Sequence, residues 1–199
     1  MPIRLIRLIL INQMMQRYTY YIIVLLAAVL MSGCGEAEYE YSGYNCRFIF
    51  DNSASRSPAL ASAMNPLSPG VFCQISMKGY YYYFSTNQRL SDRVQRGGME
   101  LQTTPILGLY PEYGIIVGYG TLGVSGANIY AYDSLCPNCY DEFGGYRKLT
   151  MNTDGTAQCP SCHRKYDMNN GGLVISDGGG KRLINYRATA NGNVLNVNN

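Results

Sequence analysis

Residues 133–167 read DSLCPNCYDEFGGYRKLTMNTDGTAQCPSCHRKYD, and they contain two Cys-Pro-x-Cys pairs separated by 19 residues. Two cysteines three positions apart on a tight turn can direct both sulfur atoms at one ion, and two such turns complete a tetrahedron. The sequence therefore predicts one metal centre, on two loops at the tips of neighbouring hairpins. The predicted ligands are Cys136, Cys139, Cys159 and Cys162.

The same pairs have two other uses in proteins, as redox dithiols or as structural disulfides. A redox dithiol needs a thiolate of lowered pKa, often at the N-terminus of a helix. The segments that follow the pairs, residues 140–145 (YDEFGG) and 163–167 (HRKYD), show no helical periodicity. We therefore favour the metal centre over both alternatives.

The rest of the chain predicts β-structure. Past residue 45, short apolar and aromatic runs alternate with turn clusters, and the chain has 19 Tyr and 22 Gly among 199 residues. The run at 80–84 (YYYYF) is typical of a strand with aromatic residues on both faces rather than of a binding platform. One short helix is expected at 59–64, and either a loop or a short helix within 88–102. The expected strands are 47–51, 72–77, 80–85, 115–119 and 128–132. The fold class is therefore all-β, in one domain over 46–198.

The residues after the second cysteine pair resemble the second half of a Rieske domain. An aromatic-Asp pair, a Gly-containing turn, a Gly-rich loop, a Leu-x-x-Tyr strand and a closing strand follow the Cys-Pro-x-Cys loop in the order and spacing of that family. In this chain they are residues 166–167, 171–172, 178–180, 183–186 and 194–197. The resemblance covers about residues 128–198 and implies an antiparallel β-sandwich with two metal-binding loops.

The ligands depart from the family pattern. Rieske domains hold a [2Fe–2S] cluster with two Cys and two His, whereas here Cys139 and Cys162 stand in place of the two histidines. His163, the one histidine, falls where the family usually has Gly. We expect His163 to border the site, or else to replace Cys162 as a ligand. The expected cofactor is a [2Fe–2S] cluster of low potential, or else zinc or a single iron; the resemblance slightly favours the cluster.

The N-terminal 33 residues predict an export signal. A basic segment precedes the apolar run 21–31 (YIIVLLAAVLM), and Ser-Gly-Cys34 then resembles the bacterial lipobox, in which the Cys is lipidated. The alternative is an uncleaved anchor, but the run is shorter than the roughly 20 residues that span a bilayer. We expect a lipid on Cys34 and a tether over 34–45. The protein would then sit at the outer membrane or cell surface, or on the periplasmic face.

Net charge gives no reason to expect nucleic acid. Arg4, Arg7 and Arg17 lie in the first 33 residues, which contain no acid, and the remainder has 13 basic and 13 acidic residues. The positive charge therefore belongs to the export signal, and the rest of the chain is electrically balanced.

Two cysteines remain, Cys46 and Cys73, each in a strand-like run. Disulfides persist in exported proteins, so we expect a bridge between adjacent strands here. The alternative is two buried free thiols that act as small apolar residues.

Two functions fit these observations. The first is a redox module that passes electrons to a partner protein. The second is a non-enzymatic surface lipoprotein in which zinc braces the two loops. With a single histidine and no convincing serine nucleophile, the chain is not expected to be a hydrolase or an oxygenase.

Overall fold

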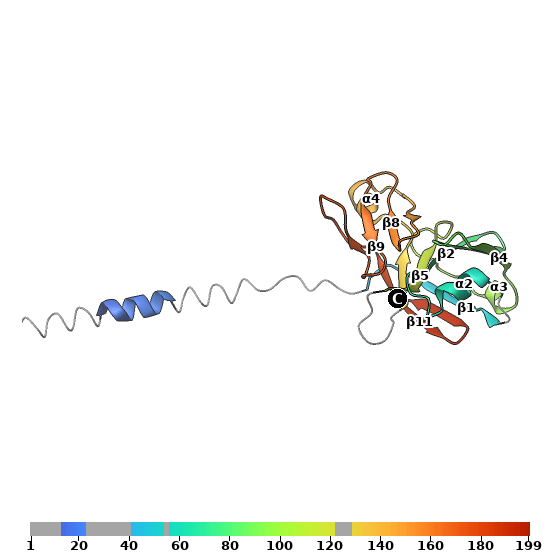
Figure 1. Ribbon diagram of the computed structural model, residues 1–199, viewed down its shortest axis with the longest axis horizontal. Coiled ribbons are helices and arrows are strands. Elements are labelled where there is room, and N and C mark those ends of the chain that lie inside the picture. Colours follow the sequence, from blue (N-terminus) through green and yellow to red (C-terminus); the bar gives the residue numbers. More distant parts are fainter. Residues whose placement is uncertain (1–12, 23–40, 54–55, 122–128) are drawn as a thin grey trace, which may run out of the picture. The chain divides into compact units, whose positions relative to one another are not determined.

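A computed structural model describes residues 13–22, 41–53, 56–121 and 129–199 (Figure 1). The chain forms two compact units, Met1–Tyr39 and Glu40–Asn199. In the first unit residues 13–22 are helical. Within the described ranges, no helix has both the length and the apolar character needed to cross a bilayer. The predicted lipidation site, Cys34, lies outside the described residues.

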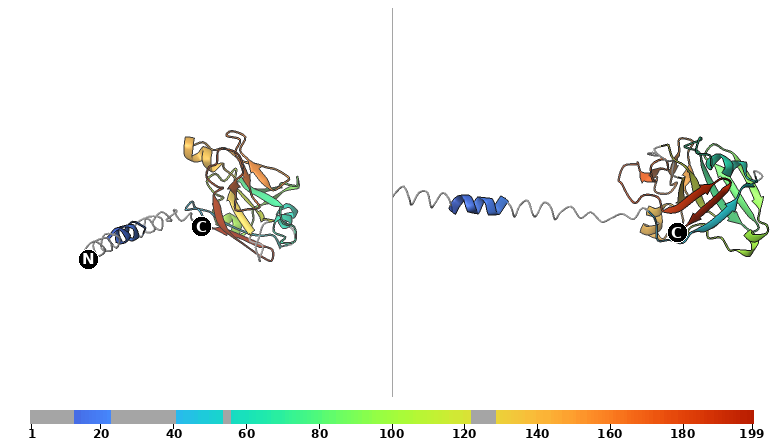
Figure 2. Two further views of the ribbon diagram at one scale, coloured as in Figure 1. Left: turned by 60° about the vertical axis from the view of Figure 1, so that its left-hand side comes forward. Right: turned by 90° about the horizontal axis from the view of Figure 1, so that it is seen from below.

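The second unit is built on an eight-stranded antiparallel sheet, which curls into an open half-barrel (Figure 2). Both edge strands are short, so few backbone groups are left unpaired at the edges. From edge to edge the strands are β1 (Arg47–Asp51), β12 (Val194–Asn198), β11 (Asn185–Asn191), β6 (Ile129–Asp133), β5 (Ile115–Tyr119), β2 (Phe72–Lys78), β3 (Tyr81–Thr86) and β4 (Ser91–Gln95).

Alternation of side chains places the main core on the concave side of this sheet. In β1, Phe48 and Phe50 are fully buried while their neighbours are exposed. In β3, Tyr82 and Phe84 point inward, and Tyr82 packs edge-on against Phe48 with ring centroids 5.4 Å apart. The tyrosine run is therefore a two-faced strand, as the sequence predicted, because successive side chains of a strand point to opposite faces.

Two short helices accompany the sheet. Helix α2 (Pro58–Ala63) begins after Ser57, whose Oγ accepts the Leu60 N–H at 3.0 Å, and Pro58 fits the first turn because its missing N–H is not needed there. The buried face of α2 joins the main core. Helix α3 (Met99–Gln102) is a single turn.

A second, smaller sheet carries the second cysteine pair at its β8–β9 turn. Its order is β10 (Leu173–Val174), β9 (Lys165–Asp167), β8 (Thr156–Gln158) and β7 (Thr150–Met151), all antiparallel (Figure 1). A separate buried cluster lies between this sheet and the large one, and it includes three of the four predicted ligand cysteines. Tyr132 of β6 crosses that cluster and donates its hydroxyl hydrogen to the Met168 carbonyl at 3.0 Å.

The predicted strands are confirmed within one or two residues at their ends, as is the helix at 59–64. Residues 88–102, for which the sequence allows either a loop or a short helix, contain both strand β4 and helix α3. The end of the predicted tether is hydrogen-bonded to the domain. The Ser42 N–H donates to the Asn185 carbonyl, and the Asn199 side-chain amide donates to the carbonyls of Ser42 and Tyr44.

The predicted disulfide between Cys46 and Cys73 is wrong. Both residues are free buried thiols. Cys46 precedes β1, which pairs with β12, whereas Cys73 lies in β2, which pairs with β3 and β5, so the two strands are not adjacent. Burial raises the pKa of Cys46 to about 12 and also raises that of Cys73, so both remain protonated and pack as small apolar residues.

Among the glycines that the structure describes, Gly114 leaves the least room for a Cβ atom. It has φ of 74°, and a Cβ there would overlap the carbonyl oxygen of Ile75 on β2. We predict that Gly114→Ala destabilises the domain by roughly 3 kcal/mol, from left-handed strain plus displacement of β2. Gly192→Ala is the control, because Gly192 has φ of 56° but open space around it; it should cost about 1 kcal/mol. Equal costs in urea unfolding would contradict this assignment.

Candidate metal centre

The first cysteine pair lies on a short helix, not at a hairpin tip as predicted. Helix α4 (Pro137–Phe143) begins after Cys136 and ends at Gly144, whose φ of 59° is left-handed. Pro137 occupies the first helical position, and the Gly144 N–H returns to the carbonyls of Cys139 and Tyr140. Pro137 at the first position and the Gly144 C-cap therefore favour a helix that the polar sequence YDEFGG did not indicate, although Cys136 makes no side-chain capping hydrogen bond.

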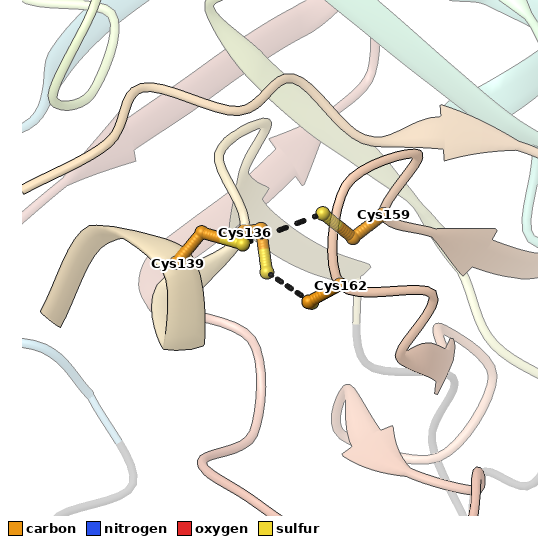
Figure 3. Close-up of side chains that lie close together, drawn as sticks. All are labelled: Cys136, Cys139, Cys159 and Cys162. Carbon is orange, nitrogen blue, oxygen red and sulfur yellow. Dashed lines mark hydrogen bonds between the residues drawn. The ribbon is translucent and has the colours of Figure 1, made fainter. Parts of the chain in front are cut away.

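The second pair lies at the tip of the β8–β9 hairpin, as predicted. Cys159 follows β8, and its N–H donates to the Arg164 carbonyl at 3.0 Å. The His163 N–H donates back to the Cys159 carbonyl at 3.0 Å, which closes the turn around Cys162. This tight turn directs both sulfur atoms toward α4 (Figure 3).

All four sulfur atoms lie within 4.8 Å of one another. The two marked contacts both run between the loops: Cys136 Sγ to Cys162 Sγ at 3.6 Å, and Cys139 Sγ to Cys159 Sγ at 3.7 Å (Figure 3). A tetrahedral Zn²⁺ site with bonds of about 2.3 Å places its sulfur atoms about 3.8 Å apart. The four-cysteine group is therefore able to hold one metal ion.

The thiols differ in acidity. Burial raises the pKa of Cys136 to about 11 and raises that of Cys139 as well. Burial also acts on Cys162, but the Arg164 backbone N–H and the neighbouring thiols outweigh it and lower its pKa to about 7. The raised pKa of Cys136, at the start of α4, argues against an activated redox dithiol there, because such a dithiol needs a lowered pKa.

Two polar side chains surround the sulfur atoms. The Tyr166 hydroxyl lies 3.1 Å from Cys136 Sγ, and Asn138 donates a hydrogen bond to that hydroxyl at 2.9 Å. Asn138 also donates to the Lys181 carbonyl at 3.0 Å and accepts the Lys181 N–H at 2.9 Å. One buried amide therefore joins helix α4, strand β9 and the glycine-rich loop before β11. Such outer groups orient metal ligands.

Two ion pairs lie at the rim. Arg164 contacts Glu142 of α4 at 3.1 Å, and Lys181 contacts Asp141 at 2.7 Å. The Cys162 sulfur is the main cause of the raised pKa of Arg164. These partly exposed pairs contribute little each, but they hold the second loop and the glycine-rich loop against α4.

His163 is not among the clustered ligands. It is exposed, and the group that could hold a metal contains four cysteines and no histidine in the described chain. Its φ of 61° is left-handed, a conformation that favours glycine. The alternative in which His163 replaces Cys162 is therefore not supported.

Sequence reasoning identified all four clustered cysteines but overlooked Asn138 and Arg164. An amide between the two cysteines of a pair was the available signal for Asn138, because a buried amide must find partners. Nothing local to Arg164 indicated that its backbone and side chain both face Cys162. No family model and no curated protein matches this chain.

We predict that Asn138→Ala destabilises the domain by about 2–4 kcal/mol, because it removes the partners of the Lys181 backbone and of the Tyr166 hydroxyl. Metal should remain bound, with an affinity lower by about 10–100-fold. Urea unfolding and a chelator competition measure the two effects. Asn170→Ala is the control, because Asn170 is exposed, and it should change stability by less than about 0.5 kcal/mol. Equal effects of both substitutions would refute the role of Asn138.

We predict that His163→Gly leaves the metal content unchanged and raises stability by about 1 kcal/mol, because glycine adopts the left-handed backbone without a Cβ penalty. Cys162→Ser is the comparison and should lose the metal. Metal analysis and thermal unfolding test both variants. Loss of metal from His163→Gly would show that the imidazole is a ligand after all.

Proposed function

We propose that the four-cysteine group holds a single Zn²⁺ as a closed structural site, in a lipid-anchored, exported protein that is not an enzyme. The mutual approach of the four sulfur atoms, all within 4.8 Å, carries this proposal. Four thiolates complete the tetrahedral shell of zinc and leave no position for a substrate or water.

The same distances favour one ion over a two-iron cluster. In a [2Fe–2S] cluster each iron holds two thiolates, so the two pairs of sulfur atoms are separated by the additional iron–iron distance. The shortest sulfur contacts here, 3.6 and 3.7 Å, each join one cysteine of the first loop to one of the second. No separation into two distant pairs is seen, which supports a mononuclear centre.

A structural role agrees with the place of the site in the fold. The smaller sheet has strands of only two or three residues, and its buried cluster is small. Short strands contribute few contacts, so this sheet has little stability of its own. A structural zinc ion supplies about 10–16 kcal/mol of apparent binding free energy, which would hold α4 against the β8–β9 hairpin.

A redox function is the second candidate, and the half-buried position of Cys162 favours it. This cysteine is more exposed than the other three, so an electron would have a short path to a partner docked at that edge. The resemblance of residues 128–198 to a Rieske domain points the same way. Either a single iron or a [2Fe–2S] cluster would then occupy the site, and the Tyr166 hydroxyl would stabilise the reduced centre through Cys136.

The proposed location rests on the first 34 residues. An apolar run followed by Ser-Gly-Cys34 fits lipidation and export, and an acylated Cys34 would keep the domain at a membrane surface. Export also fits the domain, since a metal bound by all four thiols protects them from oxidation in a compartment where disulfides form.

We predict that the purified full chain is colourless and contains one zinc per chain. Elemental analysis and a visible spectrum, before and after dithionite, measure this. Cys159→Ser and strong chelators should remove the metal and lower the thermal midpoint of unfolding, because binding and folding are coupled. Visible bands that bleach on reduction would refute the zinc proposal and support the redox function. Cys73→Ser is the control: it lies outside the site and should retain the zinc.

A further inference from the structure

An open groove lies where the two sheets meet, and none of the four ligand cysteines lines it. One wall comes from β2 and the β3–β4 turn, and the other comes from the segment 148–153 around β7. Its volume is about 660 Å³, within the range of small-molecule sites.

Hydrogen bonds fix the two walls relative to each other. Asn87, which is buried, donates to the Asn152 carbonyl across the groove at 3.3 Å and to the Gly70 carbonyl at 3.0 Å. Gln88 donates to the Thr153 carbonyl at 3.0 Å and joins the walls a second time. A groove with fixed walls binds without the entropy cost of ordering them.

The groove is positively charged. Arg89 and Lys148 line it, and no Asp or Glu does. Neither cation forms an ion pair within the described part of the chain. Partial burial lowers the pKa of Lys148, so an anion beside it would offset that loss of hydration.

Arg89 occupies a strained backbone position. Its φ is 67°, and the turn that holds it is fixed by the Arg89 N–H to the Thr86 carbonyl and by the Leu90 N–H to Thr86 Oγ1, both at 3.1 Å. Glycine or asparagine would suit this position better. This left-handed residue ends the β3–β4 turn, and the fixed turn sets where the Arg89 side chain leaves the backbone beside the groove.

We propose that this groove binds an oligosaccharide that carries carboxylate or sulfate groups. The two cations would pair with the acidic groups, and the hydroxyl and amide side chains of Ser85, Thr150 and Asn152 suit sugar hydroxyls. Leu149 and Met151 are the apolar side chains in the lining, so a peptide would find little apolar surface to bury. No aromatic side chain lines the groove, so bases of a nucleic acid would find no stacking surface.

Calorimetric titration of the full chain tests the proposal. The probes are a galacturonate hexamer, which carries carboxylates, and a heparin-derived hexasaccharide, which carries sulfates. Maltohexaose, which is uncharged, and hexaglutamate, which is an acidic peptide, are the comparators. We expect at least one of the two acidic sugars to bind, and binding to weaken as salt is added. Binding of one probe alone identifies the acidic group, and binding of both shows that the groove accepts either group.

Variants locate the site. Arg89→Gly should weaken binding by about tenfold or more, while the thermal midpoint stays level or rises because the strain is relieved. Lys148→Ala should weaken binding by a similar factor. Lys78→Ala is the matched control: it removes one exposed positive charge outside the groove and should leave the affinity unchanged.

The proposal fails if neither acidic sugar binds, if maltohexaose binds as tightly as they do, or if Lys78→Ala weakens binding as much as Lys148→Ala. Binding of hexaglutamate at least as tight as that of the sugars would reassign the groove to an acidic peptide.

Discussion

Sulfur atoms from two separate loops converge in a core that excludes most water, and the rest of the small sheet depends on that convergence. Four protonated thiols in contact gain little from one another, and four thiolates without a cation would repel strongly in such surroundings. A divalent ion removes this conflict, since it requires deprotonated ligands and binds them all. In the metal-free protein the surroundings give the cysteines different acidities: the pKa of Cys136 is raised and that of Cys162 is lowered. Metal binding would therefore release a proton from Cys136, because its raised pKa keeps this thiol protonated in the metal-free protein.

The large sheet positions the first loop through a buried carboxylate at the end of β6. Asp133 accepts the N–H groups of Leu109 and Leu135 and the hydroxyl of Tyr186, each at 2.8 Å. Burial raises the pKa of Asp133, although these three donors oppose the shift. Because its folded pKa lies above the unfolded value, its contribution to stability is complete below the unfolded pKa and is lost as pH rises through the folded pKa. Burial of the Asp133 carboxyl group is unfavourable, but its hydrogen bonds fix the direction in which the chain leaves β6 toward Cys136.

Elements stabilised by a local burial pattern could be predicted from the sequence, and elements stabilised by capping or by long-range pairing could not. Strand β1 was predictable, because Phe48 and Phe50 alternate with exposed residues and local pattern matches burial. Strand β4 was not, because it is an edge strand with Val94 as its one buried side chain. Helix α4 was not predictable, because Pro137 at its first position, the Gly144 C-cap and the packing of Cys139 stabilise it rather than apolar periodicity. The supposed disulfide failed for a topological reason: the partner of each strand is decided by long-range pairing, which composition and local spacing do not reveal.

Two residues other than glycine have positive φ in the described chain, His163 and Arg89. His163 lies beside the metal centre and Arg89 lines the groove, and the reason for the positive φ differs between them. The backbone beside Cys162 must turn sharply whatever side chain is present, because both sulfur atoms of the second pair face one point. The turn that positions Cys162 therefore imposes the left-handed backbone at His163. The exposed imidazole ring of His163 is not a ligand in the described structure. At Arg89 the turn joins two strands, and no metal geometry demands it. The left-handed residue there belongs to the β3–β4 hairpin turn, and its side chain lines the acid-free groove.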